Sequence, residues 1–240
     1  MNKRVVVIPT YNEIENISDI ISSVLSLPYD YDILVVDDNS PDGTSKAVER
    51  LMTQYPDRVF IQKRTQKTGL GTAYVHGFKW ALKHNYDYIF EMDADFSHNP
   101  KDLDLLLEAC MDGNDMTIGS RYVKGVNVVN WPLNRVLLSY FASVYVRFIT
   151  GMKIHDTTAG FICYHRSVLE SIPLDKIKFV GYAFQIEMKY RAFAKGFKIK
   201  EIPIIFTDRT KGASKMTNGI IQEAVFGVLR LRIKKLFNRL

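Results

Sequence analysis

Short apolar runs recur along the first half of the chain, and polar residues follow most of them. Runs of three or four such residues are typical of strands buried on both faces of a parallel sheet. Five runs therefore predict five strands, at Val5–Ile8, Ile33–Val36, Val59–Ile61, Tyr88–Phe90 and Met116–Ile118.

Helical periodicity separates most of these runs. One predicted helix carries a single apolar face made of Ile14, Ile17, Ile20, Ile21, Val24 and Leu25. A second begins near the candidate caps Ser40 and Gly43-Thr44, and its apolar face contains Ala47, Val48, Leu51 and Met52. The alternation of strands and helices predicts an α/β protein with an open, mostly parallel sheet.

Four of the predicted strands end in clusters of polar residues. In open sheets of this kind, ligands bind in the crevice at the carboxyl ends of the strands. We therefore expect four segments to converge on one rim, namely 9–13 (Pro-Thr-Tyr-Asn-Glu), 37–40 (Asp-Asp-Asn-Ser), 93–95 (Asp-Ala-Asp) and 120–122 (Ser-Arg-Tyr).

The composition is that of a globular domain. The chain has 240 residues, of which 47% are hydrophobic, and it contains no linker, internal repeat or low-complexity tract. Residues 1–240 are thus expected to form one domain. Cys110 and Cys163 lie in apolar surroundings without metal-ligand spacing, and no signal peptide precedes the first strand, so a reducing cytoplasm is the expected compartment.

The net charge of +6 belongs mainly to a basic tail at residues 219–240. Residues 230–240 contain no acid and five bases, and apolar residues recur at helical spacing at Ile221, Val225, Leu229, Ile233, Leu236, Phe237 and Leu240. This pattern fits an interfacial helix on an anionic membrane. It fits equally a C-terminal helix packed on the core with solvated bases opposite, and both interpretations stay open.

The uncharged stretch Val136–Val146 is too short to span a bilayer, which takes about 20 apolar residues. Membrane contact is therefore limited to the surface. The longer segment Val136–Ile149 fits either an amphipathic helix beside the site or a core helix, and we favour the core. Nucleic-acid binding is not expected, because no basic patch interleaved with aromatic residues occurs outside the tail.

Asp93 and Asp95 carry the most informative chemistry. They lie one residue apart at a predicted strand end, so both side chains can point into one site. Two buried acids without a cation would suffer repulsion and desolvation, whereas Mg²⁺ or Mn²⁺ removes that cost and neutralises a departing diphosphate. The pair therefore predicts a metal-assisted nucleotide-sugar site. His98 is expected to be structural, because hard ions prefer oxygen ligands.

Six motifs in order resemble family 2 glycosyltransferases, specifically dolichol-phosphate (polyprenol-phosphate) mannose synthases, over nearly the whole chain. They lie at residues 9–13 (PTYNE), 36–44 (VDDNSPDGT), 69–73 (GLGTA), 93–98 (DADFSH), 119–122 (GSRY) and 212–215 (GASK). The resemblance implies a GT-A, Rossmann-like fold with a nucleotide-sugar half (1–122), an acceptor half (123–218) and the amphipathic tail (219–240).

The same resemblance implies an inverting transfer of mannose from GDP-mannose to a polyprenyl phosphate, giving a β-linked lipid-phosphate mannose. The enzyme would work as a peripheral protein on the cytoplasmic face of a membrane. Some relatives of this type rely on small membrane subunits, which makes such a subunit a candidate partner.

The resemblance also assigns roles to residues. The implied donor-binding residues are Pro9, Tyr11, Glu13, Val36, Asp38, Asp93, Ala94, Asp95, Arg121, Arg209 and Lys215. The implied metal positions are Asp93, Asp95 and Ser97, where the serine replaces a longer amide side chain found in some relatives. Asp95, Arg121, Arg209 and Lys215 are the implied catalytic residues, and the three bases among them clamp phosphates. Arg135 is a further candidate on the acceptor side.

In the 69–71 motif, a glycine-rich helix start suits either phosphate approach or close packing, and packing is the commoner use.

A lipid phosphate needs no general base, because its second pKa of about 6 leaves it largely anionic at neutral pH. Removing the charge of Arg121 or Arg209 is therefore expected to cost more than changing a candidate base such as Asp156. Chemistry alone assigns no single role to Asp156, Gln185 or Glu187.

Three alternatives remain. The donor could be UDP-glucose or another nucleotide sugar. A sugar-1-phosphate nucleotidyltransferase is disfavoured, because residues 9–13 do not resemble its Gly-rich, Arg-containing loop. A noncatalytic nucleotide-sugar binding module is disfavoured by the intact acids and bases.

Overall fold

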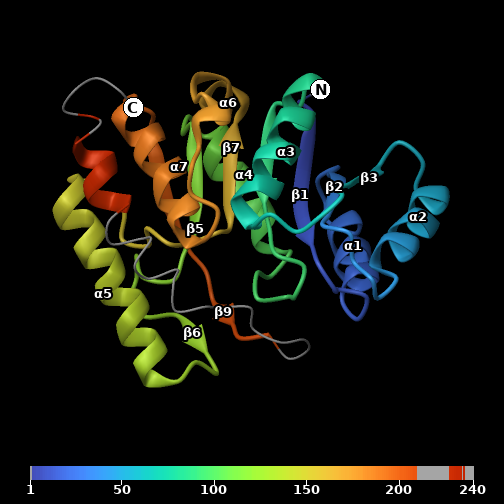
Figure 1. Ribbon diagram of the computed structural model, residues 1–240, viewed down its shortest axis with the longest axis horizontal. Coiled ribbons are helices and arrows are strands. Elements are labelled where there is room, and N and C mark those ends of the chain that lie inside the picture. Colours follow the sequence, from blue (N-terminus) through green and yellow to red (C-terminus); the bar gives the residue numbers. More distant parts are fainter. Residues whose placement is uncertain (1, 210–226, 234, 236–240) are drawn as a thin grey trace.

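The computed structural model describes residues 2–209, 227–233 and 235. Its centre is a seven-stranded sheet (Figure 1). The strands of this sheet are β1 (Arg4–Thr10), β2 (Asp32–Asp37), β3 (Val59–Lys63), β4 (Tyr88–Glu91), β5 (Met116–Ser120), β7 (Ile162–His165) and β8 (Ile199–Pro203). A separate two-stranded sheet pairs β6 (Val128–Val129) with β9 (Phe206–Thr207).

The spatial order of the large sheet is β3-β2-β1-β4-β7-β5-β8. All strand pairs in it are parallel except those of β7, which runs antiparallel between β4 and β5. The five predicted strands are confirmed, as is the mostly parallel sheet. β7 and β8 were not predicted, although residues 161–164 form an apolar run of the same kind.

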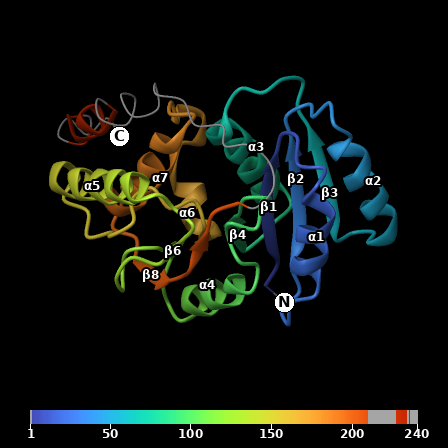
Figure 2. The same cartoon turned by 90° about the horizontal axis from the view of Figure 1, so that it is seen from below.

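Helices cover both faces of the sheet (Figure 2). One face packs against α1 (Ile17–Leu25), α2 (Thr44–Gln54) and α4 (Asp102–Met111). The other packs against α3 (Leu70–Lys83), α6 (Arg166–Ser171), the 3₁₀ turn Leu174–Lys176 and α7 (Tyr182–Ala194). Burial on both faces explains why the central strands read as continuous apolar runs. Both predicted helices form, but Ile14 lies before α1 and is 38% exposed.

Helix α5 (Leu133–Thr150) lies beside these layers rather than within them (Figure 1). Along its length only Ser143, Val146 and Thr150 are buried. Phe141 is 60% exposed and Phe148 87% exposed. The expectation that this segment is core is therefore wrong. The amphipathic alternative holds, because Val146 belongs to the core whereas Leu137, Leu138, Phe141 and Phe148 are exposed.

Residues 227–233 form a short helix near α5 and α7. Val228 and Leu231 are buried in the core that includes α7, whereas Leu229 and Ile233 are 40% and 54% exposed. This part of the basic tail thus packs on the core by one face, and leaves part of the predicted apolar stripe exposed. Tail residues 219–226, 234 and 236–240 lie outside the described residues, as does Lys215 of the acceptor half.

No helix in the described part of the chain has both the length and the apolar character needed to cross a bilayer.

Candidate active site

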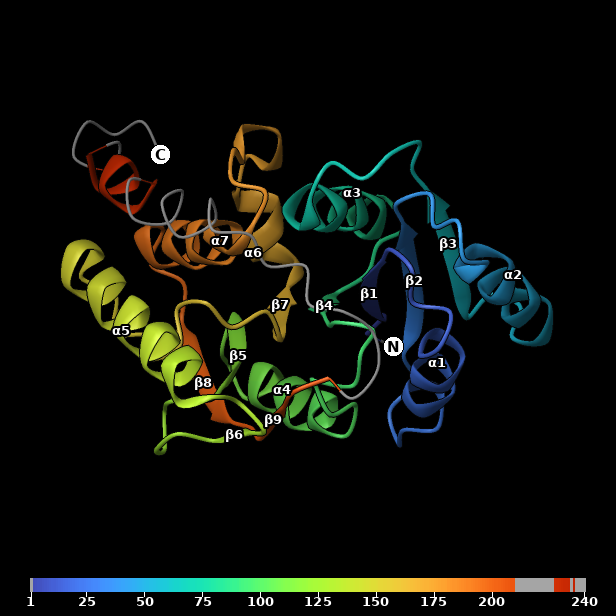
Figure 3. The ribbon, with the colours of Figure 1, turned by 60° about the horizontal axis from the view of Figure 1, so that its bottom comes forward.

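The sheet topology brings two further segments to the rim formed by the parallel strands (Figure 3). Because β7 is antiparallel, its first residue, Ile162, pairs with Glu91 and Ile118 near the carboxyl ends of β4 and β5. The segment 155–161 before β7 therefore reaches the rim. β8 runs parallel to β5 and pairs Pro203 with Ser120, so the segment 204–209 leaves the sheet at the same place.

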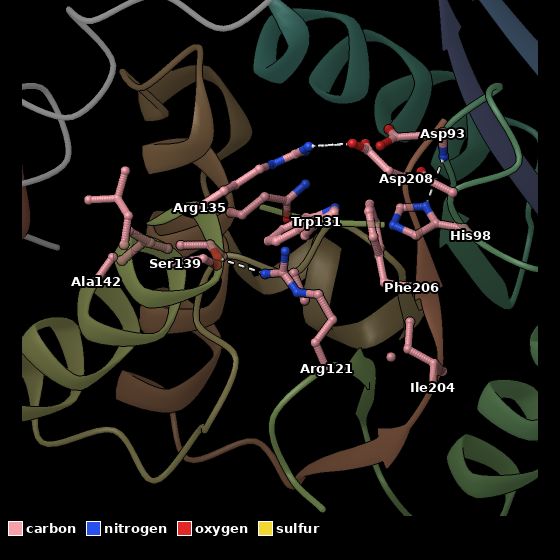
Figure 4. Close-up of a pocket in the computed structure, with 18 of the residues that line it drawn as sticks. Asp93, His98, Arg121, Trp131, Arg135, Ser139, Ala142, Ile204, Phe206 and Asp208 are labelled. Carbon is pink, nitrogen blue, oxygen red and sulfur yellow. Dashed lines mark hydrogen bonds and ion pairs between the residues drawn. The ribbon is translucent and has the colours of Figure 1, made fainter. Parts of the chain in front are cut away.

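A cavity of about 370 Å³ opens at this rim (Figure 4). Acids and arginines supply one part of its wall: Asp93, Asp95, Arg121, Arg135, Asp208 and Arg209. Helix α5 and the neighbouring segments supply an apolar part, which includes Leu138, Phe141, Ala142, Tyr145, Val146, Ile204 and Phe206. In Figure 4, Asp93 and Ala142 lie on opposite sides of the cavity. The site is therefore amphiphilic.

Asp93 and Asp95 follow β4 and line the cavity together, as predicted. Burial, followed by the nearby charge of Asp95, raises the pKa of Asp93 to about 7. Burial also acts to raise the pKa of Asp95, but Ser97 and the charge of Arg209 together lower it. The Asp95 carboxylate accepts a hydrogen bond from the Ser97 N–H at 3.1 Å and pairs with Arg209 at 2.9 Å.

These residues fit a hard divalent cation. Asp93 and Asp95 offer carboxylate oxygens, and Ser97 adds a buried hydroxyl that has no hydrogen-bond partner of normal geometry among the described residues. Oxygen donors of this kind suit Mg²⁺ and Mn²⁺. An unpaired buried hydroxyl beside two acids is what a bound cation would satisfy.

The contacts of His98 fit the structural role expected from its chemistry. Its ring stacks on Phe161 with centroids 4.8 Å apart, and its Nδ1 accepts a hydrogen bond from the Asp93 N–H at 3.1 Å. Burial lowers the pKa of His98 to about 4. The imidazole is therefore neutral at physiological pH and holds the Asp93 backbone in place.

Arg121 is held by Asp156. The Asp156 carboxylate accepts hydrogen bonds from the Arg121 N–H at 3.0 Å, from Nε at 2.7 Å and from Nη2 at 2.6 Å. The guanidinium carbon lies 5.2 to 5.5 Å from the ring centres of Tyr122, Trp131 and Phe206. Burial opposes ionisation of Asp156, but Arg121 outweighs it and lowers the pKa of Asp156. At neutral pH the Asp156 carboxylate is therefore ionised and paired with Arg121.

The other two arginines of the cavity are also paired. Arg135 contacts both carboxylate oxygens of Asp208 at 3.0 and 2.9 Å, and its guanidinium lies 4.0 Å from the Trp131 ring centre. Arg209 pairs with Asp95. Every arginine among the described residues that line the cavity therefore has a carboxylate partner, which stabilises three cations in a largely buried site.

Several predicted donor residues lie beside the cavity rather than in its wall. Pro9, Tyr11, Glu13, Val36, Asp38 and Ala94 fall at or just beyond the ends of β1, β2 and β4. Asp38 pairs with Arg64 at 3.0 Å. The Lys67 ammonium lies 4.4 Å from the ring centre of Tyr11. The structure therefore gathers the candidates on one rim and leaves their roles as predictions.

The glycine-rich start of α3 serves close packing. The Gly71 N–H donates to the Val180 carbonyl at 2.9 Å. A Cβ at Gly71 would lie 2.7 Å from the Phe179 carbonyl oxygen and from the Phe184 ring. This helix end therefore has no room for a phosphate at Gly71, and the packing interpretation holds.

Sequence reasoning missed Arg64, Asp208 and Glu201. Arg64 directly follows β3, so the strand-end rule applied to the other four strands would have found it. Asp208 directly precedes Arg209, a residue to which the family resemblance had given a role. Glu201 gave no signal, because β8 itself was not predicted.

Solved structures share this fold. The crystal structure of glucosyl-3-phosphoglycerate synthase from Mycobacterium tuberculosis with Mn²⁺, UDP-glucose and phosphoglyceric acid matches with a TM-score of 0.70 at 17% identity. The match covers 96% of this chain and 79% of that one. The complex of the same enzyme with Mn²⁺ and UDP-glucose gives a TM-score of 0.68 at 18% identity, over 99% and 79% of the two chains. The fold is thus the GT-A-like fold of nucleotide-sugar glycosyltransferases.

Sequence comparison identifies the family. Residues 5–172 match the family described as Glycosyl transferase family 2, so the chain belongs to that glycosyltransferase family. Polyprenol monophosphomannose synthase of Mycolicibacterium smegmatis is 47% identical over 99% of this chain and 89% of its own length. Undecaprenyl-phosphate mannosyltransferase of Micrococcus luteus is 44% identical over 93% and 91%. Dolichol-phosphate mannosyltransferase of Pyrococcus furiosus is 37% identical over 94% and 62%. The predicted family and enzyme class are confirmed.

Proposed function

We propose that this glycosyltransferase moves mannose from GDP-mannose to the phosphate of a polyprenyl lipid, with inversion at the anomeric carbon. The observation that carries the proposal is the amphiphilic cavity. One part of its wall holds paired acids and three arginines, and another is made of apolar side chains from α5. A phosphate attached to a long hydrocarbon chain matches both parts.

The polar part of the wall suits the departing diphosphate. A Mg²⁺ or Mn²⁺ ion held by Asp93, Asp95 and Ser97 would neutralise its charge. Arg121 and Arg209 lie in the same cavity and can hydrogen-bond phosphate oxygens, while Lys215 keeps the role that its motif implies. Pro9, Tyr11, Glu13, Val36, Asp38 and Ala94 would bind the nucleoside at the neighbouring strand ends.

No residue of the cavity has to act as a base. The acceptor phosphate is already anionic, and the Asp156 carboxylate is occupied by Arg121. The enzyme's contribution is then to place a phosphate oxygen in line with the anomeric carbon and to stabilise the charge of the leaving group.

The apolar side suits the lipid and the membrane that contains it. Phe141 lines the cavity and is also 60% exposed, so α5 joins the site to the surface of the molecule. With Phe148 and Ile233 also exposed, this surface fits peripheral contact with the cytoplasmic face of a bilayer, where a small membrane subunit would be a suitable partner. The relatives support the acceptor, because the names of all three contain a mannosyl group and a polyprenol-type lipid.

The direct test is transfer of radiolabel from GDP-mannose to polyprenyl phosphate in detergent with Mn²⁺, followed by extraction into organic solvent. We expect Mn²⁺-dependent label in the lipid phase, none with EDTA, and little from UDP-glucose. Label in the lipid phase from UDP-glucose alone would show that UDP-glucose, and not GDP-mannose, is the donor. GDP binding without lipid label from any donor, with or without added membranes, would contradict transfer and favour a binding module.

A further inference from the structure

Glu201 lies on β8, beyond the residues that match the family, and it does not line the cavity. Its side chain is only 8% exposed. One carboxylate oxygen accepts hydrogen bonds from the Ser120 hydroxyl at 2.7 Å and from the Asp156 N–H at 2.9 Å. The other lies 2.7 Å from the His155 N–H and 2.9 Å from the His155 Nδ1. A single buried carboxylate thus holds two segments that meet at the rim.

Both of these segments determine where Arg121 lies. Ser120 directly precedes Arg121 in the chain, and Asp156 binds its guanidinium and its backbone N–H. Glu201 therefore fixes Arg121 from its backbone side and from its counter-ion side. If Glu201 were lost, Asp156 could shift and the guanidinium would shift with it.

We propose that Glu201 is a positioning residue for Arg121, acting through Ser120 and Asp156. The inference rests on the proposed transfer, in which Arg121 contacts a phosphate. Small displacements of such a group are costly, since an error of about 1 Å can reduce a rate roughly 100-fold.

The groups around Glu201 explain why a carboxylate is needed. Its oxygens face a hydroxyl, two backbone N–H groups and a ring nitrogen, so acceptors are required on both sides. An amide has one acceptor oxygen and one NH₂ group. Glu201→Gln would therefore bring an N–H donor against a backbone N–H while changing the volume very little.

The test compares E201Q in two backgrounds of the full chain, wild type and R121K. Lysine keeps the charge of residue 121 but lacks the planar fork that Asp156 binds. We expect E201Q to lower kcat/KM for polyprenyl phosphate about tenfold in the wild type and less than about threefold in R121K, because residues that act through one another are not additive. E201Q should weaken binding of GDP with Mn²⁺ less than it lowers kcat/KM, because the position of Arg121 matters most when charge develops on the leaving group. Equal losses in the two backgrounds would overturn the proposal.

D115N is the matched control. The Asp115 carboxylate accepts a hydrogen bond from the Lys198 N–H at 2.8 Å, so it also ties β8 to the β5 side of the sheet, but at the end away from the cavity. We expect D115N to leave transfer within about twofold, as for an independent site.

Amide hydrogen exchange separates this proposal from the proposed function, because it needs no turnover. E201Q should speed exchange at His155, Asp156 and Arg121, whereas D115N should leave these amides protected. Unchanged protection in E201Q would overturn the positioning role even if transfer is observed. Faster exchange in a protein that makes no lipid product would contradict the transfer reaction and leave the structural coupling intact.

Discussion

Two regions of the rim are built in different ways. At the ends of β1 and β2, the Asp37 carboxylate accepts hydrogen bonds from Thr10, Ser40 and Ser45. Ser40 lies in the turn directly after β2, and Ser45 lies in the first turn of α2. In the cavity, by contrast, Arg121 depends on Asp156, which is 35 residues away, and Asp95 pairs with Arg209.

This difference indicates which residues contribute mainly to stability and which contribute mainly to transfer. Asp37 organises a turn whose shape follows from its own sequence, so its loss should lower stability. The cavity residues are distant in the chain and are held by one another's charges, so their loss should lower transfer first. Five predictions test this contrast, from the largest expected effect to the smallest.

Asp95→Asn should have the largest effect. It removes a predicted metal ligand and the partner of Arg209, so we expect transfer to fall by at least about 1,000-fold. The measurement is lipid-phase label, together with Mn²⁺-dependent GDP binding, which should also be lost. The control is Asp112→Asn, because Asp112 is 80% exposed and should be neutral. Substantial transfer by D95N would show that Asp95 is not a catalytic residue.

Arg209→Gln should lower transfer about 100-fold but strengthen binding of Mn²⁺ alone. The reason is that Arg209 occupies an oxygen of Asp95 that a metal ion would use. Titration of Mn²⁺ without nucleotide, followed by electron paramagnetic resonance, measures the second effect. R135Q removes an equal charge from the same cavity but from Asp208 rather than Asp95, so it should change Mn²⁺ affinity much less. Equal affinities in R209Q and R135Q would contradict a direct competition.

Asp37→Asn should act on stability. Four donors converge on this fully buried carboxylate, and we expect the free energy of unfolding to fall by about 2 kcal/mol. Urea denaturation followed by circular dichroism measures the change. At a temperature where the variant is folded, kcat should remain within about threefold of wild type. A large loss of kcat without a loss of stability would contradict the view that Asp37 acts mainly on stability.

Two phenylalanines of α5 separate lipid binding from membrane contact. Phe141 lines the cavity, whereas Phe148 is 87% exposed and does not. F141S should raise the KM for polyprenyl phosphate in detergent about tenfold, because it removes an aromatic contact that the bound lipid would bury. F148S should leave that KM unchanged and reduce sedimentation with anionic vesicles a few-fold. The same KM for both variants would contradict the proposal that the apolar part of the cavity binds the acceptor lipid.

The pH dependence of metal stabilisation should give the smallest effect. Burial raises the pKa of Asp93 to about 7 from an ordinary value of 3.8, so between these values the folded metal-free protein binds a proton that the unfolded chain lacks. The stability from this group is present at low pH and is lost as pH rises through about 7. Burial of Glu91 raises its pKa to about 7 and acts in the same direction.

A metal ion binds the ionised carboxylates and offsets that loss. Mn²⁺ should therefore raise the melting temperature more at pH 8 than at pH 5.5, relative to EDTA. D93N should abolish this difference, because Asp93 would no longer titrate. A metal-induced shift that is equal at the two pH values would argue against Asp93 as a ligand.

The fold was predictable where the sequence pattern is strong. Five strands were recognisable as apolar runs. Four of them are largely buried between helices, and β3, at the edge of the sheet, is mostly half-buried. β7 was not predicted, although residues 161–164 form a buried apolar run like the others. β8 has only half-buried and exposed positions, and Lys200 and Glu201 interrupt its apolar pattern. Helix α5 was misjudged because its aromatic residues resemble a core face, and nothing in its own sequence shows that they remain exposed.

The candidate site was predictable in its composition but not in its connections. Asp93, Asp95, Arg121 and Arg209 were expected together, and one cavity contains them all. Their partners were not expected, since Asp156, Asp208 and Glu201 reach the rim only through the antiparallel β7 and the parallel β8.

The sequence by itself determined the strands of the first half, the turn around Asp37, the acid pair and the family. These features depend on periodicity, turn chemistry and short motifs, which act over a few neighbouring residues. Only the tertiary structure decided which acid holds which arginine, that Glu201 supports Arg121, and that α5 forms an apolar wall of the cavity. Those outcomes depend on strand order and burial, which bring together residues that are far apart in the chain.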